Sequence, residues 1–254
     1  MATKVEKGRV KRIKKQLRLL LIAAGIALIL VTSFVIYCES YYHADEKAME
    51  AVVSYSDVVV RTVSDTATAY SMPGSTVGVI FYPGEKVETD AYAPLMCECA
   101  ERGITCILFH MPGNMPKMAA DSAASLKETL EDIFPEVESW FMAGHGAGGT
   151  AAAEFAANNT DMIAGLVLLG ACPKSDISGS PLRVMAVRGS EDKLIDASKL
   201  AGLLPAGFED KVIDGGCHSF FGMYGMQKGD GTPTITVEEQ ITKTAELMEG
   251  FVNN

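Results

Sequence analysis

Cysteine and histidine are scarce in this chain of 254 residues, which holds four histidines. The six cysteines are Cys38, Cys97, Cys99, Cys106, Cys172 and Cys217. No two of them form a Cys-x-x-Cys pair, and none has an ordered spacing to the histidines. A disulfide scaffold or a structural zinc site needs denser and paired ligands. The sequence therefore predicts neither a metal site nor a disulfide framework, and we interpret the cysteines as small buried side chains.

Positive charge is scarce beyond the N-terminus. The whole chain has a net charge of -10, whereas residues 1–18 hold eight Lys and Arg and one acid, so the remaining residues carry about -17. Nucleic-acid affinity comes mainly from Lys and Arg that neutralise phosphates. An acidic body of this size excludes nucleic acid as an expected partner.

Charge is absent from residues 19–38, "LLLIAAGIALILVTSFVIYC". As a helix, 20 such residues span about 30 Å, the thickness of a bilayer core. A cleaved signal peptide would end in a small-x-small site, but here Tyr37, Cys38 and Glu39 follow the apolar run. Bulky Tyr37 also disfavours lipidation of Cys38. The sequence predicts an uncleaved transmembrane anchor with the lipid bilayer as its partner.

Basic residues precede this segment and acids follow it, which by the positive-inside rule places the N-terminus in the cytoplasm. We therefore expect a single-pass protein of the cell membrane. Residues 1–18 would be a basic cytoplasmic tail, 19–38 the anchor, 39–54 a linker and 55–254 an extracytoplasmic domain. An extracytoplasmic location permits one disulfide bond, but the sequence does not identify which cysteines would form it.

In the body, short β-rich runs alternate with helical runs, a pattern typical of a mostly parallel sheet with helices on both faces. The expected strands are 57–63, 76–82, 103–109, 139–144, 163–170, 183–189 and 208–214. The expected helices are 91–102, 121–134, 147–158, 196–204 and 236–252. The predicted fold class is α/β, with one doubly wound sheet whose functional loops follow the carboxyl ends of the strands.

Serine is missing where this fold most often carries one. Residues 141–156, "FMAGHGAGGTAAAEFA", have the pattern of a strand, a sharp glycine-rich turn and a helix. In that context Gly-x-Ser-x-Gly places a nucleophilic serine at the turn. Position 146 is glycine instead.

Four loop motifs make residues 55–250 resemble the α/β-hydrolase family, in particular its small bacterial dienelactone-hydrolase-like or "fold 5" branch. They are the elbow "GHGAGG", "FYPGEKVETDAYAPL" after an early strand, "VRGSEDKLID" after a late strand, and "IDGGCHSFFGMYGMQKGDG" near the end. The order of elbow, acid and histidine is the order that this fold requires. The resemblance implies a hydrolase of small ester, lactone or thioester substrates that needs no cofactor.

By this resemblance, Gly146 stands at the nucleophile position, Asp192 at the acid and His218 at the general base. Glu191 and Asp196 are rivals for the acid and rank below Asp192.

The same resemblance implies that the backbone N-H of Ala147 is one oxyanion donor, with that of Glu85, or less favourably Gly84, as the other. His145 is interpreted as a structural residue packed beside the elbow. Gly144, Gly146 and Gly149 also match a Gly-x-Gly-x-x-Gly dinucleotide fingerprint, but the acid expected about 20 residues later is absent.

Glycine at position 146 supplies no attacking atom, although it enters strained backbone angles freely. Cys217 and Ser219 flank His218 and are the candidates for a displaced nucleophile. Two hypotheses follow. One is a membrane-tethered hydrolase that is severely slowed or uses water, and the other is a non-catalytic protein that binds a small carbonyl compound or lipid.

Overall fold

Residues 2–254 are described in a computed structural model, in which the chain divides after Ser40 into two compact units. The first unit contains one helix, α1 (Ala2–Glu39). Its stretch from Glu6 to Glu39 has a mean hydropathy of 2.9 in its most apolar window, and none of that window is buried. By length and composition this helix is a candidate to cross a membrane, as the apolar run predicts.

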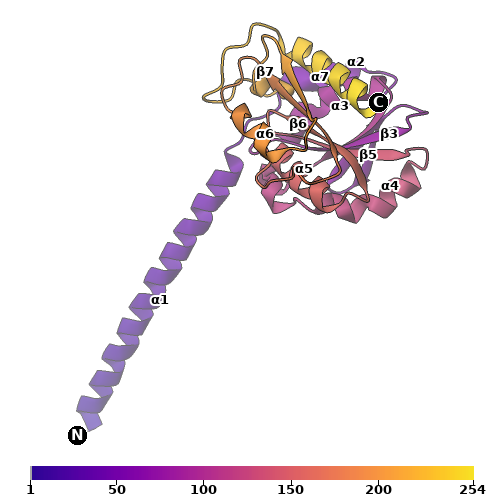
Figure 1. Cartoon of the computed structure of the whole chain (residues 1–254). Coiled ribbons are helices and arrows are strands. Elements are labelled where there is room, and N and C mark those ends of the chain that lie inside the picture. The colour runs from indigo at the N-terminus through magenta and orange to yellow at the C-terminus, as the bar shows by residue number, and fades with distance from the viewer. Residues whose placement is uncertain (1) are drawn as a thin grey trace. The chain divides into compact units, whose positions relative to one another are not determined.

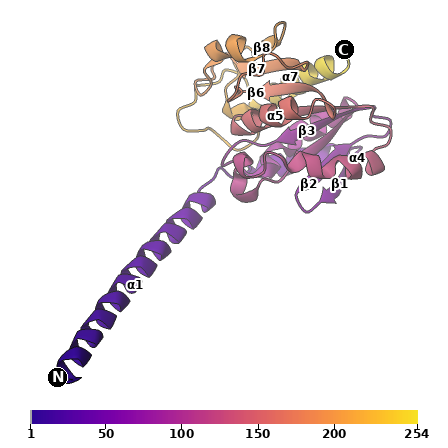
Figure 2. The ribbon, with the colours of Figure 1, turned by 60° about the horizontal axis from the view of Figure 1, so that its bottom comes forward.

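The second unit, Tyr41–Asn254, contains one eight-stranded sheet in the order β1-β2-β4-β3-β5-β6-β7-β8 (Figures 1 and 2). The strands are β1 (Val59–Ser64), β2 (Ala67–Ser71), β3 (Val77–Tyr82), β4 (Ile104–Phe109), β5 (Ser139–His145), β6 (Ile163–Leu169), β7 (Arg183–Gly189) and β8 (Glu209–Ile213). β2 pairs antiparallel with β1 and β4, and all other pairs are parallel. The predicted doubly wound, mostly parallel sheet is confirmed.

Helices cover both faces of this sheet (Figure 1). One face packs against α2 (Glu46–Ser54), α3 (Ala93–Glu101) and α7 (Val237–Val252), and the other against α4 (Lys127–Ile133), α5 (Ala147–Asn158) and α6 (Leu200–Leu203). Successive side chains of a strand alternate between the two cores, so that Phe81 joins the first and Ile80 the second. Short 3-10 turns complete the unit: Thr89–Tyr92, Pro112–Asn114, Pro116–Met118, Ser122–Leu126, Ala197–Lys199 and Ser219–Phe221.

Some elements differ from the sequence prediction. β2, "ATAYS", was not predicted because it lacks the β-branched run of its neighbours and is held by pairing on both sides. The helix expected over 121–134 begins as a 3-10 turn and is α-helical only in α4.

Residues 39–54, expected as a linker, contain regular structure, and the compact unit begins at Tyr41. Asp45 caps α2 by accepting a hydrogen bond from the Lys47 N-H, and Ala48 of that helix is fully buried. Tyr42 pairs with the segment after β3, where its N-H donates to the Lys86 carbonyl and its carbonyl accepts from the Glu88 N-H. Backbone hydrogen bonds and burial therefore fix residues that composition alone assigns to a link.

Candidate active site

The turn between β5 and α5 is the elbow that the sequence predicts. β5 ends at His145, α5 begins at Ala147, and Gly146 between them has φ 52° and ψ -120°. Side-chain-bearing residues rarely adopt a positive φ of this kind, whereas glycine does so without a steric penalty. The predicted strand, sharp turn and helix are thus present, with glycine at the turn.

The other glycines of the elbow permit close packing. A Cβ at Gly148 would lie 2.1 Å from the Pro83 carbonyl oxygen, and one at Gly144 would lie 2.6 Å from the Gly148 carbonyl carbon. A Cβ at Gly149 would meet Ala171 Cβ at 2.5 Å. Real Cβ atoms do not approach other atoms so closely. Packing of α5 on β5 and on the end of β3 thus accounts for the glycine spacing that also matched a dinucleotide fingerprint.

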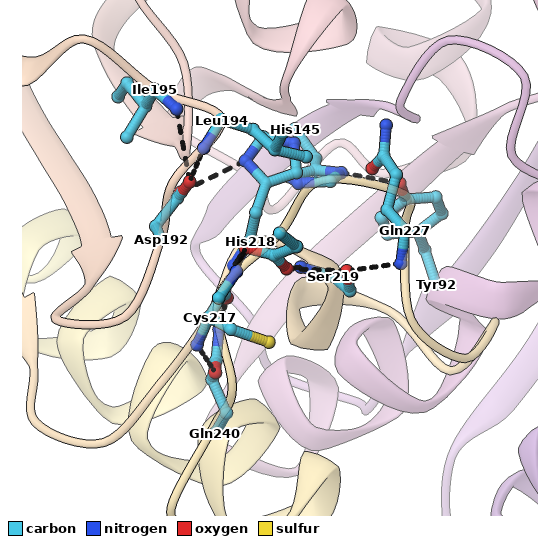
Figure 3. Close-up of polar contacts among 12 residues, drawn as sticks. Tyr92, His145, Asp192, Leu194, Ile195, Cys217, His218, Ser219, Gln227 and Gln240 are labelled. Atoms are coloured by element: carbon cyan, nitrogen blue, oxygen red, sulfur yellow. Dashed lines mark hydrogen bonds and ion pairs between the residues drawn. The ribbon is translucent and has the colours of Figure 1, made fainter.

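His218 and Asp192 contact each other, as the dashed line between them in Figure 3 shows. His218 Nδ1 is 3.0 Å from Asp192 Oδ2, and the Asp192 side chain is fully buried. The other carboxylate oxygen, Oδ1, accepts the N-H groups of Leu194 (2.9 Å) and Ile195 (3.2 Å). These three donors orient the carboxylate and offset the cost of burying it.

The opposite edge of the imidazole faces the elbow. A Cβ built on Gly146 would lie 3.4 Å from His218 Nε2 and 3.7 Å from Cε1. When Asp192 accepts the Nδ1 proton, the neutral ring has an unprotonated Nε2, which is the atom a general base uses. The structure thus brings Gly146, His218 and Asp192 together in the order that the motifs predict.

The rival acids do not reach His218. Asp196 is exposed, and its carboxylate contacts Ser198 Oγ and Lys199 Nζ. Glu191 accepts a hydrogen bond from Ser190 Oγ at 3.1 Å. Asp192 alone of the three is bonded to the imidazole.

Asp230 holds the histidine loop, a role that the sequence analysis missed. Its carboxylate accepts the N-H groups of His218 (3.3 Å), Ser219 (2.7 Å) and Gly231 (2.8 Å). Desolvation raises the pKa of this carboxyl, but these hydrogen bonds together outweigh it and leave the pKa below its ordinary value. Its position in the glycine-containing sequence "KGDG", shortly after the histidine, was the only available signal.

Neither residue that flanks His218 is poised as a displaced nucleophile. Ser219 Oγ donates to Asp230 Oδ2 at 2.6 Å and accepts the Gln227 N-H at 2.8 Å. Burial raises the pKa of the Cys217 thiol to about 12, which disfavours the reactive thiolate. The backbone N-H and carbonyl of Cys217 are both bonded to the Gln240 side chain, a second positioning group not predicted from the sequence.

The candidate oxyanion donors differ in their partners. The Gly84 N-H donates to Tyr92 Oη at 3.0 Å, and Tyr92 Oη lies 2.8 Å from His145 Nδ1. Within residues 2–254, no acceptor lies within hydrogen-bond distance of the N-H of Ala147 or of Glu85. The Ala147 and Glu85 N-H groups are therefore the ones open to a ligand.

His145 is fully enclosed between these groups. Its pKa is well below the ordinary value because burial penalises the charged ring and because the His218 ring is near, with centroids 4.4 Å apart. A neutral His145 accepts the Tyr92 hydroxyl proton at Nδ1 and carries its own proton on Nε2. It packs against the elbow and links it to the loop after β3.

A cavity of about 570 Å³ opens over the elbow. Gly146, Ala147 and His218 form part of its wall, together with Leu194 and Ile195 of the acid loop. It has the size expected of a small-molecule site. In the described part of the chain, no group of three or more His, Cys, Asp and Glu side chains is placed to hold a metal ion.

Comparisons with known proteins identify the fold and the family. Solved structures similar in fold include a predicted CIB-like hydrolase from Thermoplasma acidophilum, at 13% identity and a TM-score of 0.56, covering 76% of this chain and 99% of the other. ESTFA in its Fe-lacking apo form is 16% identical with a TM-score of 0.54, covering 76% of this chain and 84% of the other. No curated protein matches the chain. Residues 78–242 match the model of the alpha/beta hydrolase family, and the chain belongs to that family.

Proposed function

We propose that this protein is a slow hydrolase of small ester, lactone or thioester substrates, in which His218 activates water in place of a serine. The observation that carries the proposal is the intact pair of His218 and Asp192, with Nε2 3.4 Å from the position that a Cβ of residue 146 would take. The motif order favours the dienelactone-hydrolase-like branch of the family.

In the proposed reaction, a water molecule occupies the space left by the missing side chain. His218 Nε2 takes one proton from this water while the water oxygen bonds to the substrate carbonyl carbon. Asp192 stabilises the imidazolium that results. The N-H groups of Ala147 and Glu85 stabilise the oxyanion. His218 then returns the proton to the leaving alcohol or thiol as its bond to carbon breaks, and the acid product is released.

The expected rate is low. Triad hydrolases that lack one member retain about 10³- to 10⁴-fold acceleration over water, from the oxyanion donors and substrate binding. Water must also be positioned anew in each cycle, without the covalent attachment that a serine provides. No acyl-enzyme forms in this scheme.

A non-catalytic protein is the second candidate, and the glycine at position 146 is the observation that favours it. The cavity, the open Ala147 N-H and the His218 imidazole together suit a small carbonyl compound or a lipid as a ligand.

Hydrolysis of 4-nitrophenyl acetate by the full chain tests the catalytic proposal. We expect slow turnover without a burst of nitrophenol, no labelling by a fluorophosphonate, and loss of the activity in His218→Ala. His110→Ala is the matched control, because His110 contacts Thr68 outside the cavity. If native protein and His218→Ala hydrolyse the ester at equal rates, the binding protein is the better assignment.

We further propose that residues 19–38 anchor the protein in the cell membrane, with 1–18 in the cytoplasm and residues 41–254 outside. The charge step across this segment supports that orientation. Protease added to intact cells should then remove the body and leave an N-terminal tag protected. A protected body with an accessible N-terminal tag would reverse the assigned orientation.

A further inference from the structure

The side chains that line the cavity over the elbow include more bases than acids, unlike the body around it. Beyond residue 18 the chain holds 14 Lys and Arg against 31 Asp and Glu. The cavity wall instead includes three lysines, Lys117, Lys174 and Lys199, and a single carboxylate, Asp196. Acids outnumber bases about twofold in the body, and bases outnumber acids threefold here.

The ammonium groups of this wall are only partly neutralised. Lys199 Nζ lies 3.1 Å from Asp196 Oδ2, and Lys117 Nζ lies 3.9 Å from Glu85 Oε2. Lys174 is exposed, and within residues 2–254 no carboxylate lies within ion-pair distance of its Nζ. At least one positive charge of the wall is therefore available to a ligand.

The backbone at the start of α5 adds positive potential to the cavity wall. α5 is a 12-residue helix whose first turn contains no acid, and Gly146 at its N-cap has no side chain to accept the first N-H groups. A helix N-terminus carries partial positive charge, which nothing in the first turn offsets here. The lysine side chains and the helix end that line the cavity thus act in the same direction.

We propose that the cavity binds a substrate or ligand that carries an acid group, either carboxylate or phosphate. Its carbonyl lies over Gly146, and its acid group lies against Lys174 with Lys117 and Lys199 nearby. This names the substrate class of the site in the proposed function and rests on that function for its catalytic meaning. The ammonium groups are point charges and recognise both kinds of anion.

The test measures binding by ligand-detected NMR with detergent-solubilised full chain and three probes: phenylacetate, phenyl phosphate and neutral phenylacetamide. We expect both anions to bind more tightly than the amide, and this preference to shrink as salt is raised. Lys174→Gln should lower the preference about two- to fivefold, the range of a partly exposed ion pair, while Lys174→Arg retains it.

Lys127→Gln is the matched control. Lys127 lines a separate cavity of about 350 Å³ with Trp140 and Ile163, at the amino ends of β5 and β6, and it contacts Asp161 at the same 3.9 Å that separates Lys117 from Glu85. Its substitution should leave the preference unchanged. If only phenylacetate binds, the acid group of the ligand is a carboxylate, and if only phenyl phosphate binds, it is a phosphate.

Two outcomes overturn the inference: no preference for the anions over the amide, or an equal loss in Lys127→Gln and Lys174→Gln. Binding needs no turnover, so the inference survives if the chain proves catalytically inert. Conversely, turnover of neutral esters without anion preference refutes the inference and leaves the proposed hydrolysis intact.

Discussion

Replacing Gly146 by serine restores the one atom group that the elbow lacks. The new Cβ would lie 3.4 Å from His218 Nε2, and no other atom is within 4 Å except Cε1 of the same ring. Oγ extends one bond further and can reach hydrogen-bond distance of Nε2 without displacing a neighbour. Since Asp192 already holds the ring at Nδ1, the substitution needs no other change to complete a serine triad.

The expected gain in rate is large and the expected loss in stability is moderate. Loss of the serine from a working triad costs about 10⁶ in kcat, so Gly146→Ser should raise the esterase rate by at least about 10³-fold even if positioning is imperfect. Serine must also hold φ 52° and ψ -120°, a strained region that costs about 1 to 3 kcal/mol. For a unit of this size that corresponds to a fall in Tm of about 2 to 12 °C.

The assay follows nitrophenol release from 4-nitrophenyl acetate together with fluorophosphonate labelling. Gly146→Ser should show a burst and become labelled, and both should disappear when His218→Ala is added. If Gly146→Ser folds with a lower Tm but gains neither activity nor labelling, the argument from geometry to catalysis is refuted, and the oxyanion donors would not be placed for a carbonyl.

Three further predictions concern the frame of the site. Gly148→Ala should destabilise the fold by more than about 3 kcal/mol, because its Cβ would meet the Pro83 carbonyl at 2.1 Å, whereas Gly179→Ala, with nothing within 4 Å, should leave Tm nearly unchanged. Asp230→Asn should lower Tm most at neutral pH. The depressed pKa of Asp230 stabilises the fold at pH values above the unfolded pKa near 4, and this stabilisation is lost as the pH falls through the folded pKa. An equal loss of Tm at every pH would contradict this prediction. The pKa of buried His145 is also depressed, so the native fold loses stability as the pH falls below the unfolded pKa of about 6.5. Thermal melts should therefore show a smaller fall in Tm from about pH 7 to pH 5 for His145→Gln than for the native chain.

The sheet could be predicted from the sequence because its central strands are apolar on both faces. β5, β6 and β7 are buried runs bounded by turns, and their order with the helices leaves few topologies. β2 is different, since its alanine-rich sequence has weak strand propensity and is specified by its neighbours β1 and β4. The local sequence pattern therefore identifies strands whose own side chains are apolar. It misses strands that are stabilised mainly by hydrogen bonds to their neighbours.

The positions of Gly146, Asp192 and His218 could be predicted because each lies in the loop that follows a strand, where the fold fixes its location. The groups that support them could not. Asp230 and Tyr92 act through hydrogen bonds to backbone groups that are distant or follow irregular loops, and an acid or a tyrosine in a loop has no distinctive spacing. Topology sets the positions of the three candidate site residues, whereas the length and direction of other side chains decide which groups support them.

Residues 41–45 make contacts that the composition of this segment does not predict. The Tyr42 backbone bonds to the loop after β3, its Oη accepts the Lys228 N-H at 3.0 Å, and the Asp45 N-H donates to the Met223 carbonyl at 2.8 Å. This short segment thus joins the loop of Glu85 to the loop that follows His218, and Tyr42 and Lys228 are 186 residues apart in the sequence. Residues 41–45 begin two residues after the end of α1. Truncation of the chain before residue 55 would therefore remove these contacts together with the apolar helix. The compact unit therefore begins at Tyr41, and the two loops that this segment joins belong to the same fold as Asp192 and His218.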